Sequence, residues 1–181
     1  MKGPFMGLLS KYSVNAVPGR RFIEVYDADA YLDDAAAMDA ARRQVVAGNG
    51  YHLYLYSLQA DIPAQVDIRI WDAPPPAPGD AEGHVAITLE SETGALVVNQ
   101  LSYGPAGDMT LPRPGVYRGT AWWTGRQAMG SYHETTLRDL AASGPEARLA
   151  DDWRHTPHTE RYVLDLAWER DPSPLDVEDD W

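Results

Sequence analysis

The sequence contains no cysteine. This excludes disulfides, thiolate nucleophiles and cysteine metal ligands, and it is compatible with a reducing compartment. No apolar run approaches the roughly 20 residues that a membrane-spanning helix needs. The run Met6–Leu9 near the N-terminus is too short for a signal peptide and is followed by polar residues. We therefore expect a cytoplasmic protein that has no membrane partner.

Basic residues are also scarce, with 15 Lys and Arg against 27 Asp and Glu and a net charge of −12. This balance argues against nucleic acid as a partner, because binding to phosphates requires a basic surface. Residues 169–181 carry six acids and one base, so much of the charge lies in an acidic C-terminal tail. A solvated terminus and an interaction tail for a basic partner both explain this composition.

Two segments near the C-terminus predict neighbouring central strands, residues 111–123 and residues 162–168. Both alternate with the period of a half-buried strand. The second carries Tyr162, Leu164, Leu166 and Trp168 on one face. Pro112, Pro114 and Gly115 give the first a rigid beginning. Arg118 and Asp165 are expected to form a cross-strand pair between the two strands.

The remaining pattern predicts a mainly β fold, an antiparallel β-sandwich with one long α-helix at about 30–47 and a helical insertion at about 131–153. Asp29 is the expected N-cap of the first helix, and its expected buried stripe is Tyr31, Ala35, Met38, Ala41 and Val45. Further strands are predicted at 12–17, 22–26, 51–58, 66–71, 84–90 and 95–101. The last two are expected to form a hairpin, and 103–108 a loop. Residues 1–168 are expected to be one domain, followed by the tail at 169–181.

The sequence predicts no catalytic residue, no metal site and no cofactor. His155 and His158 are close in sequence, but Pro157 breaks the helix that would place both on one face. His133 and Glu134 on the insertion form a possible acid–base pair, for which a solvated helix face is the simpler explanation. There is no nucleophile elbow and no glycine-rich phosphate loop.

The order of elements resembles the small β-sandwich family of the competence protein ComJ, the inhibitor of a DNA-entry nuclease. The similarity rests on residues 111–118, Trp122 and residues 160–165. It implies a non-enzymatic, acidic inhibitor or immunity-type protein. The long insertion at 124–159 and the acidic tail depart from the pattern, which leaves the identity of any target open.

The main hypothesis is a protein-binding module for a basic partner such as a nuclease or toxin, steered by acids and anchored by an aromatic ring. The expected partner-binding residues are Asp33, Asp34, Glu92, Trp122, Asp176, Glu178, Asp179 and Asp180. An alternative is a carbohydrate or small-molecule platform of exposed rings, built from Tyr54, Tyr56 and Trp71, which Trp122 could join. An enzyme that uses His133 and Glu134 is the third hypothesis, and it requires a pocket around them. The oligomeric state is not indicated.

Overall fold

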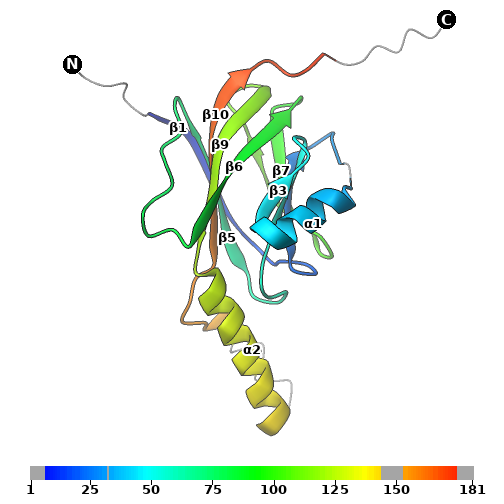
Figure 1. Cartoon of the computed structure of the whole chain (residues 1–181). Coiled ribbons are helices and arrows are strands. Elements are labelled where there is room, and N and C mark those ends of the chain that lie inside the picture. Colours follow the sequence, from blue (N-terminus) through cyan, green and yellow to red (C-terminus); the bar gives the residue numbers. More distant parts are fainter. Residues whose placement is uncertain (1–6, 32, 144–152, 175–181) are drawn as a thin grey trace, which may run out of the picture.

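The computed structural model describes residues 7–31, 33–143 and 153–174, which form ten strands and two helices (Figure 1). In chain order these are β1 Leu8–Ala16, β2 Phe22–Asp27, α1 Ala35–Gln44, β3 Val46–Gly48, β4 His52–Tyr56, β5 Ala64–Trp71, β6 Gly83–Ser91, β7 Ala95–Gln100, β8 Gly104–Thr110, β9 Gly115–Thr124, α2 Arg126–Ser143 and β10 Arg161–Arg170. The fold is mainly β, as the sequence predicts. Neither helix is both long enough and apolar enough to cross a membrane, within the residues described.

The strands form two five-stranded sheets that face each other. Sheet A has the order β1-β5-β10-β9-β6, and sheet B has the order β3-β4-β2-β7-β8. All pairs are antiparallel except β5 and β10, which run parallel. The expected antiparallel sandwich is therefore correct apart from this one pair, which arises because the last strand inserts between β5 and β9.

The core lies between the sheets and is built from the inward face of each strand. Its fully buried members include Ile23, Val25, Leu53, Leu55, Val66, Ile68, Leu89, Val98, Tyr117, Tyr162, Leu164 and Leu166. The predicted inward face of β10 is thus confirmed, and Trp168 packs against the same cluster. Burial of aliphatic and aromatic side chains of this size is the main source of stability in such a fold.

The two segments at 111–123 and 162–168 are neighbouring strands, as predicted: β9 and β10 pair at the centre of sheet A. Gly115 begins β9 with φ 155°, and a Cβ there would lie 2.2 Å from Trp168 Nε1, so no side chain fits. The hydroxyl of Tyr117 donates to the carbonyl of Arg113 at 2.6 Å, which ties the strand to its proline-rich approach.

The first helix is shorter than predicted, because α1 covers residues 35–44 instead of 30–47. Asp34, not Asp29, is the N-cap, and its side chain accepts from the backbone amide of Ala37 at 3.0 Å. Val45 ends the helix with φ 73°, and the following residues pair with β4 as β3. The expected buried stripe is correct at Ala41, but Ala37 is buried in place of the exposed Ala35, and Tyr31 lies before the helix and is 54% exposed.

The predicted hairpin of 84–90 with 95–101 is wrong. Both segments are strands, but β6 pairs with β9 in sheet A while β7 pairs with β2 and β8 in sheet B. The turn at 92–94 therefore crosses from one sheet to the other. Residues 103–108, expected to be a loop, largely belong to β8, which pairs with β7 despite its two glycines and its proline. Tertiary pairing overrides the weak strand propensity of these residues.

The predicted insertion helix is confirmed and begins earlier than expected, at Arg126 directly after β9. Gly125, with φ 71°, turns the chain between the two elements, and a Cβ there would lie 1.9 Å from the carbonyl oxygen of Thr159. Helix α2 extends away from one end of the sandwich, whereas α1 lies over the outer face of sheet B (Figure 1). The short helix expected at 146–153 falls largely outside the described residues.

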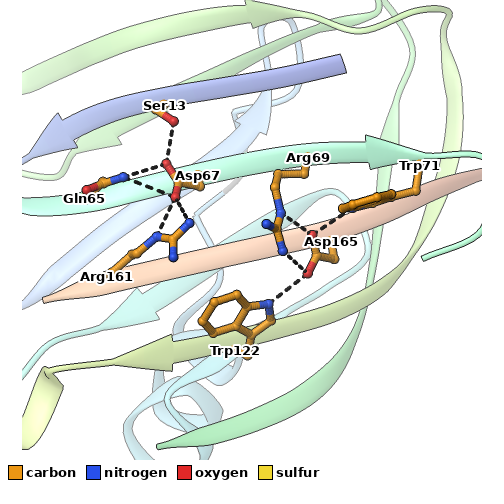
Figure 2. A network of polar contacts seen from close by, with 8 residues as sticks. All are labelled: Ser13, Gln65, Asp67, Arg69, Trp71, Trp122, Arg161 and Asp165. Atoms are coloured by element: carbon orange, nitrogen blue, oxygen red, sulfur yellow. Dashed lines mark hydrogen bonds and ion pairs between the residues drawn. The ribbon is translucent and has the colours of Figure 1, made fainter. Parts of the chain in front are cut away.

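The outer face of sheet A carries two buried carboxylates, each held by an arginine (Figure 2). Asp165 accepts from Arg69 at 2.6 and 2.8 Å, and from Trp71 and Trp122 at 2.8 Å each. Asp67 is bound by Arg161, Ser13 and Gln65. The expected Arg118–Asp165 pair is wrong, because Asp165 lies opposite Thr120, and Arg118 pairs with Glu169 instead.

Candidate functional site

The acids predicted to bind a partner near α1 and near the β6–β7 turn come together at one end of the sandwich. Ser91, at the end of β6, pairs with Gly115 at the start of β9, whereas α2 follows the other end of β9. The β6–β7 turn therefore lies at the end of the sandwich opposite α2. The segment before α1 and the β6–β7 turn lie on the same side there (Figure 1). We define the acidic end as Asp29, Asp33, Asp34, Glu90 and Glu92 with the rings Tyr31 and Tyr51.

Asp27 joins the two halves of the acidic end. Its buried carboxylate at the end of β2 accepts from the hydroxyl of Ser91, and from the amide and hydroxyl of Thr93 at 3.0 and 2.7 Å. It also accepts from the amide of Asp29 at 3.0 Å. Burial raises its pKa, but these hydrogen bonds outweigh burial, and the resulting pKa is below the ordinary value. An ionised Asp27 therefore holds the turn that carries Glu92 against the segment that carries Asp33.

Asp34 links α1 to the β3–β4 turn. Besides capping Ala37, its carboxylate accepts from the side-chain amide of Asn49 at 3.2 Å. Its pKa is lowered, first by the hydrogen bond from the Ala37 amide and then by that from Asn49. Asn49 in turn accepts from the amide of Tyr51 at 2.9 Å. The cap and the tyrosine are therefore fixed relative to each other.

Two exposed tyrosines lie among these carboxylates. Tyr31 donates its hydroxyl to Asp33 at 3.2 Å and is 54% exposed, and Tyr51 is 39% exposed. Partial desolvation and the charges of Glu24 and Asp33 raise the pKa of Tyr31 to about 12. A hydrogen bond to Glu90, and then the charges of Glu90 and Glu92, raise the pKa of Tyr51. Nearby negative charge contributes to both shifts, because it disfavours a phenolate.

The described part of the C-terminus ends at the same place. The backbone amide of Ser173 donates to Glu90, and this contact helps lower the pKa of Glu90 against the opposing effect of burial. The tail acids Asp176, Glu178, Asp179 and Asp180 lie outside the described residues. Ser173, near the end of the described residues, lies beside the acidic end.

The aromatic residues expected at a binding surface are placed elsewhere. Trp122, proposed as an anchor, is 5% exposed on the outer face of sheet A, where it lies beneath the guanidinium groups of Arg69 and Arg161. Of the alternative platform, Tyr54 is fully buried against α1, Tyr56 is half-buried on sheet B, and Trp71 is half-buried on sheet A. These three rings do not share one surface.

Sequence reasoning missed Tyr31 and Tyr51 as surface rings. Tyr31 was assigned to a buried helical stripe because the helix was expected to begin at residue 30. The signal that could have found it is its position between acids before a capping aspartate, since such flanks favour an exposed loop. Tyr51 follows Gly48-Asn49-Gly50, a sequence that indicates a turn, and a residue next to a turn is often exposed.

The insertion carries the acid–base candidates in an open groove of about 360 Å³ between α2 and the segment after β4. His133 Nε2 lies 2.6 Å from Asp61, and its ring stacks on Trp153 with centroids 4.9 Å apart. Glu134 is exposed and bonds Arg138 on the same helix. Within the described residues, no three metal-ligating side chains cluster. The groove is therefore open to solvent, and His133 beside it is held in one orientation by Asp61 and Trp153.

Comparison with known proteins identifies structural neighbours only. No protein-family profile and no curated protein sequence matches the chain. A solved structure of ComJ from Bacillus subtilis, described as an inhibitor of the DNA-degrading activity of NucA, superposes with a TM-score of 0.58 at 12% identity, covering 91% of this chain and 99% of ComJ. A crocagin biosynthetic protein, the product of gene J, gives a TM-score of 0.50 at 15% identity, covering 90% of this chain and all of that one. The ComJ-like resemblance is thus confirmed for the fold.

Proposed function

We propose that this chain is a non-catalytic protein-binding module that inhibits a basic partner, such as a nuclease or toxin, through its acidic end. The observation that carries the proposal is the convergence of Asp33, Asp34 and Glu92 around Tyr31 and Tyr51. The tail acids Asp176, Glu178, Asp179 and Asp180 are proposed as further contacts to the partner, because Ser173, three residues before them, donates to Glu90. The lack of cysteine supports a cytoplasmic site of action.

The acidic end combines the two properties that a docking surface for a basic protein needs. The carboxylates of Asp33, Asp34 and Glu90 are held by hydrogen bonds, so these three lose little side-chain entropy when a cation approaches. Its two tyrosines offer flat, amphipathic rings, which are enriched among the residues that dominate interface energies. Long-range attraction from a chain of charge −12 would speed the encounter with a basic partner.

The fold neighbour supports the same function. ComJ is described as inhibiting a DNA-degrading activity, so a sandwich of this shape serves as an inhibitor in at least that protein. Function resides in surfaces and not in the fold, and for this chain the acidic end is the surface that fits the role. The carbohydrate alternative gains no support, because Tyr54 is fully buried and Trp71 lies on the other sheet from Tyr56.

The test compares partner capture by wild type and by a variant with Asp33→Asn and Glu92→Gln. Tagged protein is incubated with native cell extract, captured basic proteins are identified by mass spectrometry, and the strongest is purified for titration. Loss of two exposed charges should weaken binding about tenfold, which corresponds to about 0.7 kcal/mol for each acid. Tyr31→Ala should weaken it about 30-fold, the effect of a hot spot of about 2 kcal/mol.

The matched control removes the same charge elsewhere, with Asp80→Asn in the β5–β6 loop and Glu134→Gln on α2. Both residues are exposed. This control should bind like wild type, and wild-type affinity should fall steeply between about 50 and 300 mM salt. Equal weakening by both double variants, or salt-independent binding, would refute docking through the acidic end.

A further inference from the structure

Strand β1 forms an open edge of sheet A. It pairs with β5 on one side and has no neighbouring strand on the other. The pairing shifts between Leu8 and Ser10 and then runs without a break from Ser10 to Ala16. Within the described residues, no backbone–backbone hydrogen bond joins the segment from Ser10 to Asn15 to anything other than β5. Alternate residues of this segment therefore present unpaired amides and carbonyls at the edge.

The other sheet edges carry features that hinder pairing with a further strand. In sheet B, β3 has only three residues, and β8 contains Pro105 and an interrupted pairing with β7. In sheet A, the backbone amide of Glu90 in β6 donates to the carbonyl of Gly50 at 2.7 Å, so part of that edge is already used. Prolines, bulges and covering contacts are common protections of edge strands. Strand β1 contains no proline, and its one register shift lies at its first residues.

Two exposed leucines stand at the beginning of β1. Leu8 is 48% exposed and Leu9 is 61% exposed. In contrast, Ile87 and Leu89 of β6 are buried. In the described part of the chain, neither helix covers β1, because α1 lies over sheet B and α2 extends from one end of the sandwich (Figure 1). An unprotected edge with exposed leucines is typical of a surface that pairs with another strand.

The charges beside β1 nearly cancel, although the net charge of the chain is −12. The strand itself carries a single charge, that of Lys11. Among the acids that approach it, Asp67 is paired with Arg161. Asp72, which accepts from the amide just before the strand, and Asp108 on β8 are the others. Two copies can therefore approach each other at this edge with little of the repulsion expected from their total charge.

The partner that fits this edge is a second copy of the chain. A strand of a basic protein would bring like charge to Lys11. Two antiparallel copies of β1 instead set each lysine opposite an uncharged residue, in every register except the one centred on Lys11. Two copies of β6 would bring carboxylates together, because that strand and its flanks carry Asp80, Glu82, Glu90 and Glu92.

We infer that two copies pair edge to edge through β1, antiparallel about a two-fold axis, so that their five-stranded sheets A form one continuous sheet. A pairing of nine residues spans about 30 Å and is isologous, the commonest arrangement in symmetric oligomers. The leucines at the beginning of each β1 then lie beside the end of the other β1 and leave water. This inference goes beyond the proposed function, and neither depends on the other.

Sedimentation of the wild-type protein over a range of concentrations gives the first test. An edge pairing buries little area, at or below about 1,200 Å², so we expect a dissociation constant near about 100 µM. Raising the salt concentration from about 50 to 300 mM should strengthen the association several-fold, because salt screens the repulsion between two chains of charge −12. Partner binding at the acidic end has the opposite dependence on salt, so the two proposals fail separately.

Amide exchange measured by NMR on the same wild-type protein locates the contact. Between about 30 and 500 µM protein, exchange of alternate amides from Ser10 to Asn15 should slow by about two- to threefold, as the fraction of monomer falls. The amides of β6 should not change. A monomer at about 500 µM in the higher salt, or exchange in β1 that does not depend on concentration, would overturn the inference. Both results come from wild type and need no variant that folds.

The absence of cysteine permits a scan for the two-fold axis, with single cysteines from Ser10→Cys to Asn15→Cys. The residue on the axis faces itself in the second copy with Cα atoms about 4.5–5.5 Å apart, a separation that a disulfide can bridge. One position should therefore cross-link under mild oxidation faster than its neighbours and faster than Ala86→Cys, an exposed control on edge strand β6. A scan without such a maximum would place any dimer elsewhere and refute pairing through β1.

Discussion

Asp165 is a buried carboxylate on the outer face of sheet A, and its replacement by asparagine should be costly. The carboxylate is 1% exposed and accepts four hydrogen bonds, two from Arg69 and one each from the indoles of Trp71 and Trp122 (Figure 2). Asparagine keeps the shape but offers one oxygen in place of two, and turns an amide donor toward these donors.

The magnitude follows from the burial of each partner. Removing one member of a buried ion pair costs about 3–5 kcal/mol, because the other charge is left without compensation. The Arg69 side chain is 21% exposed and can regain part of its hydration, which places the expected loss near about 3 kcal/mol. For a chain of this size, that corresponds to a fall in melting temperature of roughly 6–12 °C.

The assay is urea unfolding followed by tryptophan fluorescence, with Glu169→Gln as the matched control. Glu169 is a second carboxylate on β10, but its bond to Arg118 joins side chains that are 39% and 63% exposed. The control should therefore lose less than about 1 kcal/mol. A loss for Asp165→Asn as small as that of the control would refute the idea that burial makes this network stabilising.

The dependence on pH gives a second check. Burial raises the pKa of Asp165, but the bonds from Arg69, Trp122 and Trp71 outweigh it, so the pKa in the folded state lies below 3.8. The stabilisation by the carboxylate is thus fully present above pH 3.8 and is lost as the pH falls through the folded-state pKa. The difference between wild type and Asp165→Asn should be constant from about pH 5 to 8 and shrink only in stronger acid.

Three further changes test other parts of the fold. Burial raises the pKa of Glu160, so its stabilising neutral form is fully present below pH 4.5 and is lost as the pH rises through the folded-state pKa. In urea titrations, the unfolding free energy of wild type should fall relative to that of Glu160→Gln as the pH rises from 4.5. A difference in unfolding free energy that does not change with pH would contradict this. Gly115→Ala should cost more than about 1 kcal/mol in thermal unfolding, because the new Cβ meets Trp168, and an unchanged melting temperature would show that β9 adjusts freely. Tyr117→Phe should cost about 1 kcal/mol by losing the bond to Arg113, and no loss in urea unfolding would show that water replaces this bond.

The fold class could be predicted from the sequence because period-two alternation depends only on local order. Residues 162–168 alternate so regularly that one register buries the apolar face, and the structure confirms both that face and the pairing with β9. The rigid sequence Pro112–Gly115 marked the beginning of β9 in the same local way. Helix α2 was also found, because its composition and the residues that follow it are local signals.

The candidate site could be predicted only in part. The acids Asp33, Asp34 and Glu92 were chosen by their charge, and the structure brings them together through Asp27 and Asn49, contacts made over long sequence distances. The prediction of which aromatic rings are exposed is wrong, because the burial of an aromatic residue depends on the segments that cover it. Trp122 is buried by arginines from two other strands, and no spacing within β9 reveals them.

By itself, the sequence determined most of the strands, though not β3 and β8, together with the excess of acid and the absence of thiol chemistry, since each depends on residue identity and short-range order. Only the tertiary structure decided which strand joins which sheet, and therefore that β6 and β7 separate at a turn that sequence reasoning assigned to a hairpin. The same assembly placed His52 beside Glu24 under Tyr31. Such contacts arise when distant segments exclude water together, and a linear pattern does not encode which segments those are.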